Sequence, residues 1–268
     1  MADRWAVATG NWSATATWNG GTLPAAGDDV YADGYTVTIN QNVTVASLRT
    51  TQRSGGTAGG AFNTSGAVVV NADSRAGTTP ALQILSQGVH NGNSYGGTGV
   101  ASYGTVIRYG AVQNGNATAG TGNFAQGSFV EGILNGNSYG GGATSNAWGA
   151  EVLNVQNGNA IGGSGSQAYG SFVNRAGFFN GQATGGSVSG AHGIFVSAGS
   201  KAVVTLASGS TSGAFGVSSA AGSIVLIKAE SGSFPKSLAA GTDTTTTNVP
   251  FLAQSGGCPL VGHGGLVY

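Results

Sequence analysis

The sequence predicts an all-β fold: a right-handed, single-stranded parallel β-helix, or β-solenoid, with coils of about 22 residues. Three observations predict it. An Asn-Gly dipeptide recurs at steps of 23, 21, 22 and 23 residues, a second glycine recurs in phase with it, and a short β-type run follows each second glycine. A period near 22 residues is too short for paired-helix repeats, which need roughly 33–47, and suits a solenoid coil. The residue before each second glycine is named the marker residue below; the markers are Tyr103, Gln126, Trp148, Tyr169, His192 and Phe215.

Residues 1–89 precede the repeat and are predicted to form a tryptophan-rich N-terminal cap and the first strands of the β-helix. Three of the four tryptophans lie in it, at Trp5, Trp12 and Trp18. Alternation of apolar and polar residues predicts strands at 28–33, 35–40, 43–48, 67–71 and 81–85. Residues 90–227 are then predicted to form the repeat solenoid, and residues 228–268 a C-terminal cap or extended arm.

Each coil of the repeat is expected to contribute a strand to a parallel stack. The predicted strands are 105–107, 128–130, 150–152, 171–173 and 194–196, and a last strand at 224–227 closes the stack. The third residue after each second glycine (the glycine that follows a marker residue) is aliphatic, so this column is expected to line the interior. Its members are Ile107, Val130, Val152, Val173 and Val196.

The preceding column should face outward, because neighbouring residues on a strand point to opposite faces. It contains Val106, Phe129, Glu151, Phe172 and Phe195. One interpretation is a coil corner that buries both faces. The other is a subunit interface made by Phe129, Phe172 and Phe195, which together with the absence of net charge predicts a homotrimer. Glu151 interrupts the phenylalanines and would need an arginine or a polar partner, for example from a neighbouring chain.

The asparagines of the Asn-Gly dipeptides are predicted to be structural. Asparagine tolerates left-handed backbone and makes tight turns when glycine follows it. Stacked at a coil corner, such side chains can hydrogen-bond up and down the stack, which favours a structural role over ligand binding. The predicted asparagine ladder is Asn91, Asn114, Asn135, Asn157 and Asn180.

Aromatic residues at the marker positions leave two interpretations open. The favoured one places Tyr103, Trp148, Tyr169, His192 and Phe215 in the solenoid interior, because burying aromatic rings contributes much stability. The other is an exposed row of rings that would offer flat platforms to sugars. Tyr95 and Tyr139, in the arms that follow the Asn-Gly dipeptides, are the candidate glycan contacts.

Composition excludes several classes of function. Nine basic and nine acidic residues give a net charge of zero, which argues against nucleic-acid binding. No apolar stretch reaches the length of a membrane span, and no secretory signal is recognisable, so we expect synthesis in the cytoplasm and no membrane partner. The single cysteine and the scattered histidines suggest no metal site, and no motif indicates a cofactor.

The opening of the chain resembles that of β-helical surface proteins of bacteria and bacteriophages. The residues that carry this resemblance are Gly10–Ser13, Ala16–Trp18, Pro24–Asp29 and Gly34–Ile39. Because no signal peptide is recognisable, this resemblance implies a bacteriophage virion protein made in the host cytoplasm. Such a protein would be a non-enzymatic structural component, either a surface-exposed tail appendage or adhesin or a capsid-decorating protein. Its expected partners are other virion proteins and a host surface polysaccharide.

Catalysis is the competing hypothesis, because some phage β-helices cleave polysaccharides. Glycoside hydrolysis needs two carboxyl groups about 5–9.5 Å apart. Glu131 and Glu151 lie in adjacent coils as diagonal neighbours, roughly 7–8 Å apart, so they are the candidate catalytic pair. Arg108 lies directly below Glu131 in the predicted stack and could instead pair with it at the surface. The alternatives to a non-enzymatic virion protein are therefore a carbohydrate-active β-helix and a bacterial adhesin fragment.

Overall fold

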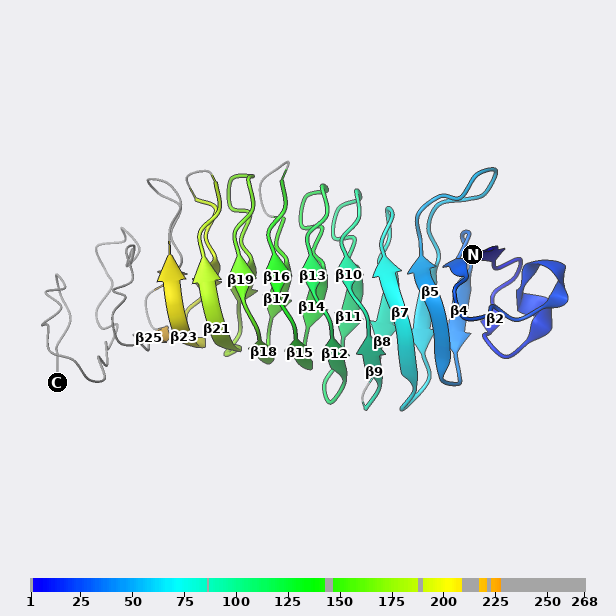
Figure 1. The fold of residues 1–268 in the computed structure, drawn as a ribbon, viewed down its shortest axis with the longest axis horizontal. Coiled ribbons are helices and arrows are strands. Elements are labelled where there is room, and N and C mark those ends of the chain that lie inside the picture. The colour runs from blue at the N-terminus through cyan, green and yellow to red at the C-terminus, as the bar shows by residue number, and fades with distance from the viewer. Residues whose placement is uncertain are drawn as a thin grey trace, which may run out of the picture.

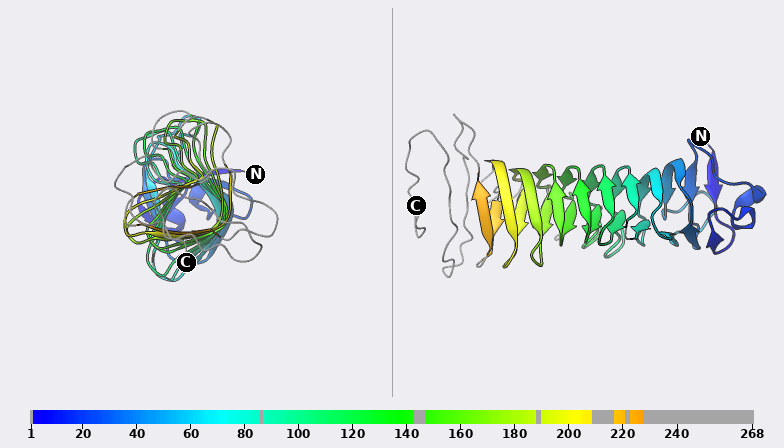
Figure 2. Two further views of the ribbon diagram at one scale, coloured as in Figure 1. Left: turned by 90° about the vertical axis from the view of Figure 1, so that its left-hand side faces the viewer. Right: turned by 90° about the horizontal axis from the view of Figure 1, so that it is seen from below.

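The chain folds as a single stack of coils. The computed structural model describes residues 2–85, 87–142, 147–187, 190–208, 217–220 and 223–227. It is all-β, with parallel strands stacked as a β-solenoid of about nine turns of roughly 23 residues. Viewed along the long axis, the coils lie one behind another (Figure 2). The predicted fold class is therefore confirmed, whereas Phe215 and the predicted arm at 228–268 lie outside the described residues.

One parallel sheet runs along the whole described stack. Its long strands near both ends divide in the middle coils into two rows of short strands, on either side of the Asn-Gly dipeptides that begin at Asn91, Asn114, Asn135 and Asn157. Asn180-Gly181, in contrast, lies within one continuous strand. The members are β1 (Asp3–Trp5), β3 (Asp29–Tyr31), β5 (Val43–Arg49), β7 (Val69–Arg75), β9 (Val89–Asn91), β10 (Ser94–Tyr95), β12 (Val112–Asn114), β13 (Ala117–Thr118), β15 (Ile133–Asn135), β16 (Ser138–Tyr139), β18 (Val155–Asn157), β19 (Ala160–Ile161), β21 (Phe178–Thr184), β23 (Lys201–Ser208) and β25 (Ile224–Ile227).

A second parallel sheet faces the first across the interior. It contains β2 (Gly10–Asn11), β4 (Thr36–Ile39), β6 (Ala61–Thr64), β8 (Leu82–Ile84), β11 (Thr105–Ile107), β14 (Ser128–Val130), β17 (Ala150–Val152), β20 (Ser171–Val173), β22 (Ile194–Val196) and β24 (Val217–Ser219). The strands β11, β14, β17, β20 and β22 have the bounds predicted from the sequence. Two short 3₁₀ helices, η1 (Thr15–Thr17) and η2 (Asn19–Gly21), lie in the N-terminal segment.

The predicted aliphatic column lines the interior. Ile107 pairs in register with Val130, and the same register continues through Val152, Val173 and Val196. All five side chains are fully buried. The burial and the register predicted from the glycine spacing are both confirmed.

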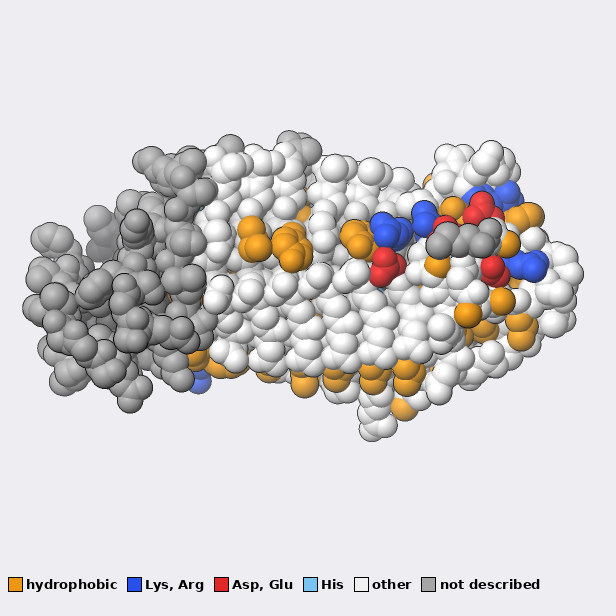
Figure 3. Space-filling view, viewed as in Figure 1, with side chains coloured by type: hydrophobic (Ala, Val, Ile, Leu, Met, Phe, Trp, Pro, Cys, Tyr) orange, Lys and Arg blue, Asp and Glu red, His pale blue; other side chains and the backbone are white. Residues whose placement is uncertain are grey.

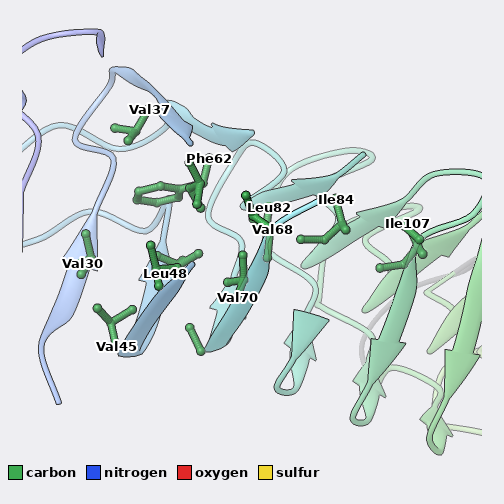
Figure 4. Close-up of a cluster of buried hydrophobic side chains, with 14 of the residues drawn as sticks. Val30, Val37, Val45, Leu48, Phe62, Val68, Val70, Leu82, Ile84 and Ile107 are labelled. Atoms are coloured by element: carbon green, nitrogen blue, oxygen red, sulfur yellow. The ribbon is translucent and has the colours of Figure 1, made fainter. Parts of the chain in front are cut away.

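The N-terminal coils close one end of this core. Trp12 and Trp18 are buried edge to face, with ring centroids 4.8 Å apart, and the indole of Trp18 donates a hydrogen bond to the Trp12 carbonyl. Phe62 lies beyond them, and aliphatic residues from β3 to β11 continue the core (Figure 4). Both sheets run through the predicted boundary at residue 89 without a break.

The interior also contains buried polar side chains that the sequence analysis did not predict. Gln113 and Gln156 occupy the middle of β12 and β18, fully buried. Each amide donates to one serine and accepts from another, so Gln156 donates to Ser138 and accepts from Ser171. His90 holds the equivalent position in β9, where a ring nitrogen hydrogen-bonds with the Ala72 carbonyl across 2.7 Å. Buried polar groups are tolerated when paired in this way.

On the face shown in Figure 3, charged side chains gather at the N-terminal end of the stack, and the repeat coils present mainly backbone and uncharged side chains with rows of hydrophobic residues. The ion pairs of the described residues are Arg4–Asp28, Arg49–Asp29, Arg53–Asp33, Arg75–Asp73 and Arg108–Glu131. In the described part of the chain no helix is long and apolar enough to cross a membrane.

Candidate functional site

The aromatic markers of the described residues pack against the outward column of the second sheet rather than beside the aliphatic column, so the prediction that they fill the interior is wrong, although Trp148 and Tyr169 are buried. The glycine after each marker explains why. A side chain at Gly104 would meet the backbone nitrogen of Tyr95 at 2.4 Å, and one at Gly127 would meet that of Thr118 at 2.3 Å. The two walls of the coil touch here through their backbones, which leaves no interior space for a neighbouring ring.

A repeating contact joins four of the markers, Tyr103, Gln126, Trp148 and Tyr169, to the outward residue of the next coil. The ring of Tyr103 lies 5.6 Å from that of Phe129, and the ring of Tyr169 lies 5.4 Å from that of Phe195. Trp148 and Phe172 make the tightest such contact, with ring centroids 4.4 Å apart. The phenylalanines face outward as predicted, but rings of their own chain leave them only half-exposed.

Further ring contacts join these pairs into an external aromatic face. Phe124 meets Trp148 edge to face, and Tyr169 stacks between Trp148 and His192 at 6.1 and 5.5 Å. The outer aromatic face, as we use the term below, is Tyr103, Phe124, Phe129, Trp148, Tyr169, Phe172, His192 and Phe195. Trp148 and Tyr169 are its most deeply covered members.

Burial keeps the titratable rings of this face uncharged near neutral pH. Burial raises the pKa of Tyr169, and burial together with the negative charge of Glu151 raises the pKa of Tyr103. Burial lowers the pKa of His192 below the ordinary value. The face therefore presents neutral rings. The carboxylate of Glu151 lies between them.

Glu151 and Gln126 replace one ring pair of the face. Glu151 is the register neighbour of Phe129 on one side and of Phe172 on the other. Its carboxylate accepts hydrogen bonds from the amides of Gln126, at 2.9 Å, and Asn174, at 3.1 Å. The polar partner that the sequence analysis required for Glu151 thus comes from its own chain, and no neighbouring chain is needed to supply it.

The two candidate catalytic carboxylates have separate partners. Glu131 forms an ion pair with Arg108 at 2.8 Å, the surface pairing that the sequence analysis offered as the alternative to catalysis. Glu151 is held by the two amides named above. Both carboxylates therefore have structural partners in adjacent coils, and this arrangement gives no support to a joint catalytic role.

The asparagines of the Asn-Gly dipeptides form a hydrogen-bonded ladder on the exposed corner. Asn114 donates to Asn91 at 2.9 Å, and Asn135 and Asn157 continue the series at 3.1 Å each. The ladder begins one coil before the predicted start, because Asn91 donates to Asn71. Asn180 pairs with Asn157 in the strand register.

A second ladder lies two residues further along each coil and was missed by the sequence analysis. The side-chain oxygen of Asn93 accepts from the backbone nitrogen of Asn116, and Asn116 does the same for Asn137. Asn137 and Asn159 repeat the contact toward the next coils. The Asn-Gly-Asn pattern at 91–93, 114–116, 135–137 and 157–159 was the signal that could have predicted it.

Tyr95 and Tyr139, the candidate glycan contacts, lie on the first sheet rather than on the outer aromatic face. Strand register aligns them in one outward column, with Thr118 between them and Ile161 beyond. The Arg75 guanidinium covers the Tyr95 ring at 4.0 Å. Figure 3 shows rows of hydrophobic side chains along this otherwise polar side of the molecule.

Comparisons with known proteins add little to this description. No protein-family model matches the chain, and no curated protein matches it significantly. A structural match was found to the crystal structure of a hyper-glycosylated fragment of TibA (residues 55–350), a product of TibC catalysis. Identity is 14%, the match covers 85% of this chain and 91% of that one, and the TM-score is 0.23.

Proposed function

We propose that this chain is the rod of a non-enzymatic surface adhesin that binds polysaccharide along its side. The observation that carries the proposal is the outer aromatic face. The coils do not need these rings for their interior, which the aliphatic and polar columns already fill. Contiguous apolar side chains on the outside of a soluble protein mark interaction sites, and rings with a few polar groups among them suit carbohydrate.

Rigidity supports the same proposal. The asparagine ladders, interior hydrogen bonds such as Gln156 to Ser138 and ion pairs such as Arg49–Asp29 join one coil to the next. An extended stack held in this way presents a long, regular side to a polymer, which suits repeated contacts with a polysaccharide chain.

A polysaccharide-binding panel with the intact chain tests this function. The proposal predicts retention of at least one surface polysaccharide without release of new reducing ends. Turnover that disappears in Glu131→Gln or Glu151→Gln would make the chain a glycosidase and overturn the non-enzymatic assignment. Lack of binding to every glycan would overturn the adhesive role.

A bacteriophage virion appendage or capsid-decorating protein is the second candidate function. The resemblance of the opening segment at residues 5–50 favours it, and the rod geometry suits such a role. Immunogold labelling of purified phage particles with an antibody to this chain would decide between the candidates. Label on the particle supports the virion assignment, and label confined to bacterial surfaces supports the cellular adhesin.

A further inference from the structure

We propose that Glu151 and Gln126 form a subsite for a protonated amino sugar on the outer aromatic face. The proposal rests on the proposed function and names the sugar class that this face selects. Three features of the site carry it: the charge of Glu151, the hydrogen-bonding capacity of the amides around it, and the rings on either side.

The first feature is a carboxylate whose partners are neutral. In the described part of the chain, Asp28, Asp29, Asp33, Asp73 and Glu131 each have an arginine within ion-pair distance. The partners of Glu151 are instead the amides of Gln126 and Asn174. These two hydrogen bonds fix the carboxylate in place without neutralising it. A half-buried charge in such a setting favours a cationic ligand and disfavours an acidic one.

The second feature is a side-chain acceptor next to Glu151 that has no donor. Gln126 and Asn174 each donate one side-chain N–H to Glu151, and the Asn174 oxygen already accepts from the Arg175 backbone nitrogen and the Ser197 hydroxyl. The side-chain oxygen of Gln126 is buried and has no hydrogen-bond partner. A buried acceptor without a donor is unfavourable. A ligand ammonium beside Glu151 would donate to the carboxylate, and a shift of the Gln126 side chain would bring this oxygen within reach of the same ammonium.

The third feature is the pair of ring walls. Phe129 and Phe172 flank Glu151 on the two neighbouring strands. Strand spacing puts their Cα atoms about 9.6 Å apart, twice the roughly 4.8 Å between adjacent strands. Each ring leans against the marker of the preceding coil, Tyr103 or Trp148. The walls thus offer apolar surface to the C–H face of a pyranose ring and ring faces to its ammonium group.

Titration calorimetry with a short glucosamine oligomer and its fully N-acetylated counterpart tests the subsite near pH 6. We expect the glucosamine oligomer to bind and the acetylated oligomer to bind about tenfold more weakly or worse, since loss of one charged hydrogen bond accounts for about that factor. Glu151→Gln, which keeps the shape and removes the charge, should remove the preference. Glu131→Gln is the matched control and should leave it unchanged.

A second variant protects the test against misfolding. The double variant Gln126→Tyr with Glu151→Phe restores the ring pair found in neighbouring coils, so it should fold and lose the preference for glucosamine. Equal binding of both oligomers, or an unchanged preference in Glu151→Gln, would overturn the amino-sugar subsite. Equal binding of neutral glycans to wild type and to Glu151→Gln would support the proposed adhesive function while the amino-sugar subsite fails. Absence of all glycan binding would overturn both the adhesive function and the subsite.

Discussion

The amide of Gln126 and the carboxylate of Glu151, 2.9 Å apart, occupy the positions that the rings of Tyr103 and Phe129 occupy one coil earlier. A polar pair has therefore replaced an aromatic pair as a unit. The two residues should depend on each other energetically, as neighbours in one contact commonly do.

A double-mutant cycle measures this dependence. Glu151→Phe leaves the Gln126 amide unpaired, and Gln126→Tyr leaves the carboxylate with one donor fewer, so each should lower the free energy of unfolding by about 1–2 kcal/mol. The double variant forms a ring pair and should recover most of that loss, with a coupling energy of about 1 kcal/mol or more. Urea denaturation of the four proteins gives the value, and strictly additive effects would disprove the pairing.

The asparagine ladder should stabilise the stack. Asn135→Ala removes the hydrogen bond to Asn114 and the one from Asn157. Because the ladder is exposed to water, we expect a loss of about 1 kcal/mol in the free energy of unfolding. Asn123→Ala, in an exposed arm, is the control and should change stability by less than about 0.5 kcal/mol. Equal effects of the two substitutions would mean that the ladder hydrogen bonds do not contribute to the free energy of unfolding.

His90 should make stability depend on pH. Burial lowers its pKa to about 4, although the Ala72 carbonyl and the charge of Asp73 act in the opposite direction. The unfolded chain, with a pKa near 6.5, binds the proton first as the pH falls. The His90 contribution to stability is therefore intact above about pH 6.5, falls between there and about pH 4, and is constant below, a loss of roughly 3 kcal/mol in total.

His90→Gln isolates this contribution. Gln113 is the register neighbour of His90 in the next coil and satisfies the same interior position with serine partners. The variant should fold and lose the His90 part of the pH dependence, while the carboxylates titrate as before. Denaturation between pH 4 and 7.5 gives the comparison, and parallel curves for the two proteins would contradict the neutral, buried histidine.

The marker glycines should not tolerate a side chain. A Cβ atom at Gly127 would lie 2.3 Å from the Thr118 backbone nitrogen, so Gly127→Ala must separate the two walls of the coil. We expect a loss of about 3 kcal/mol in the free energy of unfolding, the upper range for overpacked sites. Gly142→Ala, where the nearest atom is a serine side-chain oxygen at 3.2 Å, should be mild. Thermal unfolding of both variants makes the comparison.

The homotrimer remains a prediction from the sequence. Rings of the same chain partly cover Phe129, Phe172 and Phe195, and Glu151 has its polar partners within the chain. A neighbouring chain is therefore needed less to bury the phenylalanines and not at all to pair Glu151. Sedimentation equilibrium at micromolar concentration should still give three times the monomer mass if the remaining exposed ring edges pack between chains. A monomer mass would restrict the outer aromatic face to ligand binding.

Glycine and asparagine spacing predicted the stack, the strand bounds and the interior column from Ile107 to Val196, because backbone contacts between coils impose a fixed period. The side on which the marker rings lie could not be predicted. It depends on the distance between Gly104 and Tyr95, which follows from how the two walls of a coil approach each other. The hydrogen bond between Gln126 and Glu151 could not be predicted either. It joins residues 25 positions apart, and their contact depends on how two neighbouring coils pack.

Oxidative footprinting with a polysaccharide that binds the chain tests the lateral binding face most directly. Hydroxyl radicals label exposed aromatic rings, so bound polymer should protect Phe129, Phe172 and Phe195. Tyr35, which is 38% exposed at the N-terminal end of the stack, should be labelled equally with and without the polymer. Unchanged labelling of all three phenylalanines in the presence of bound polysaccharide would contradict the account.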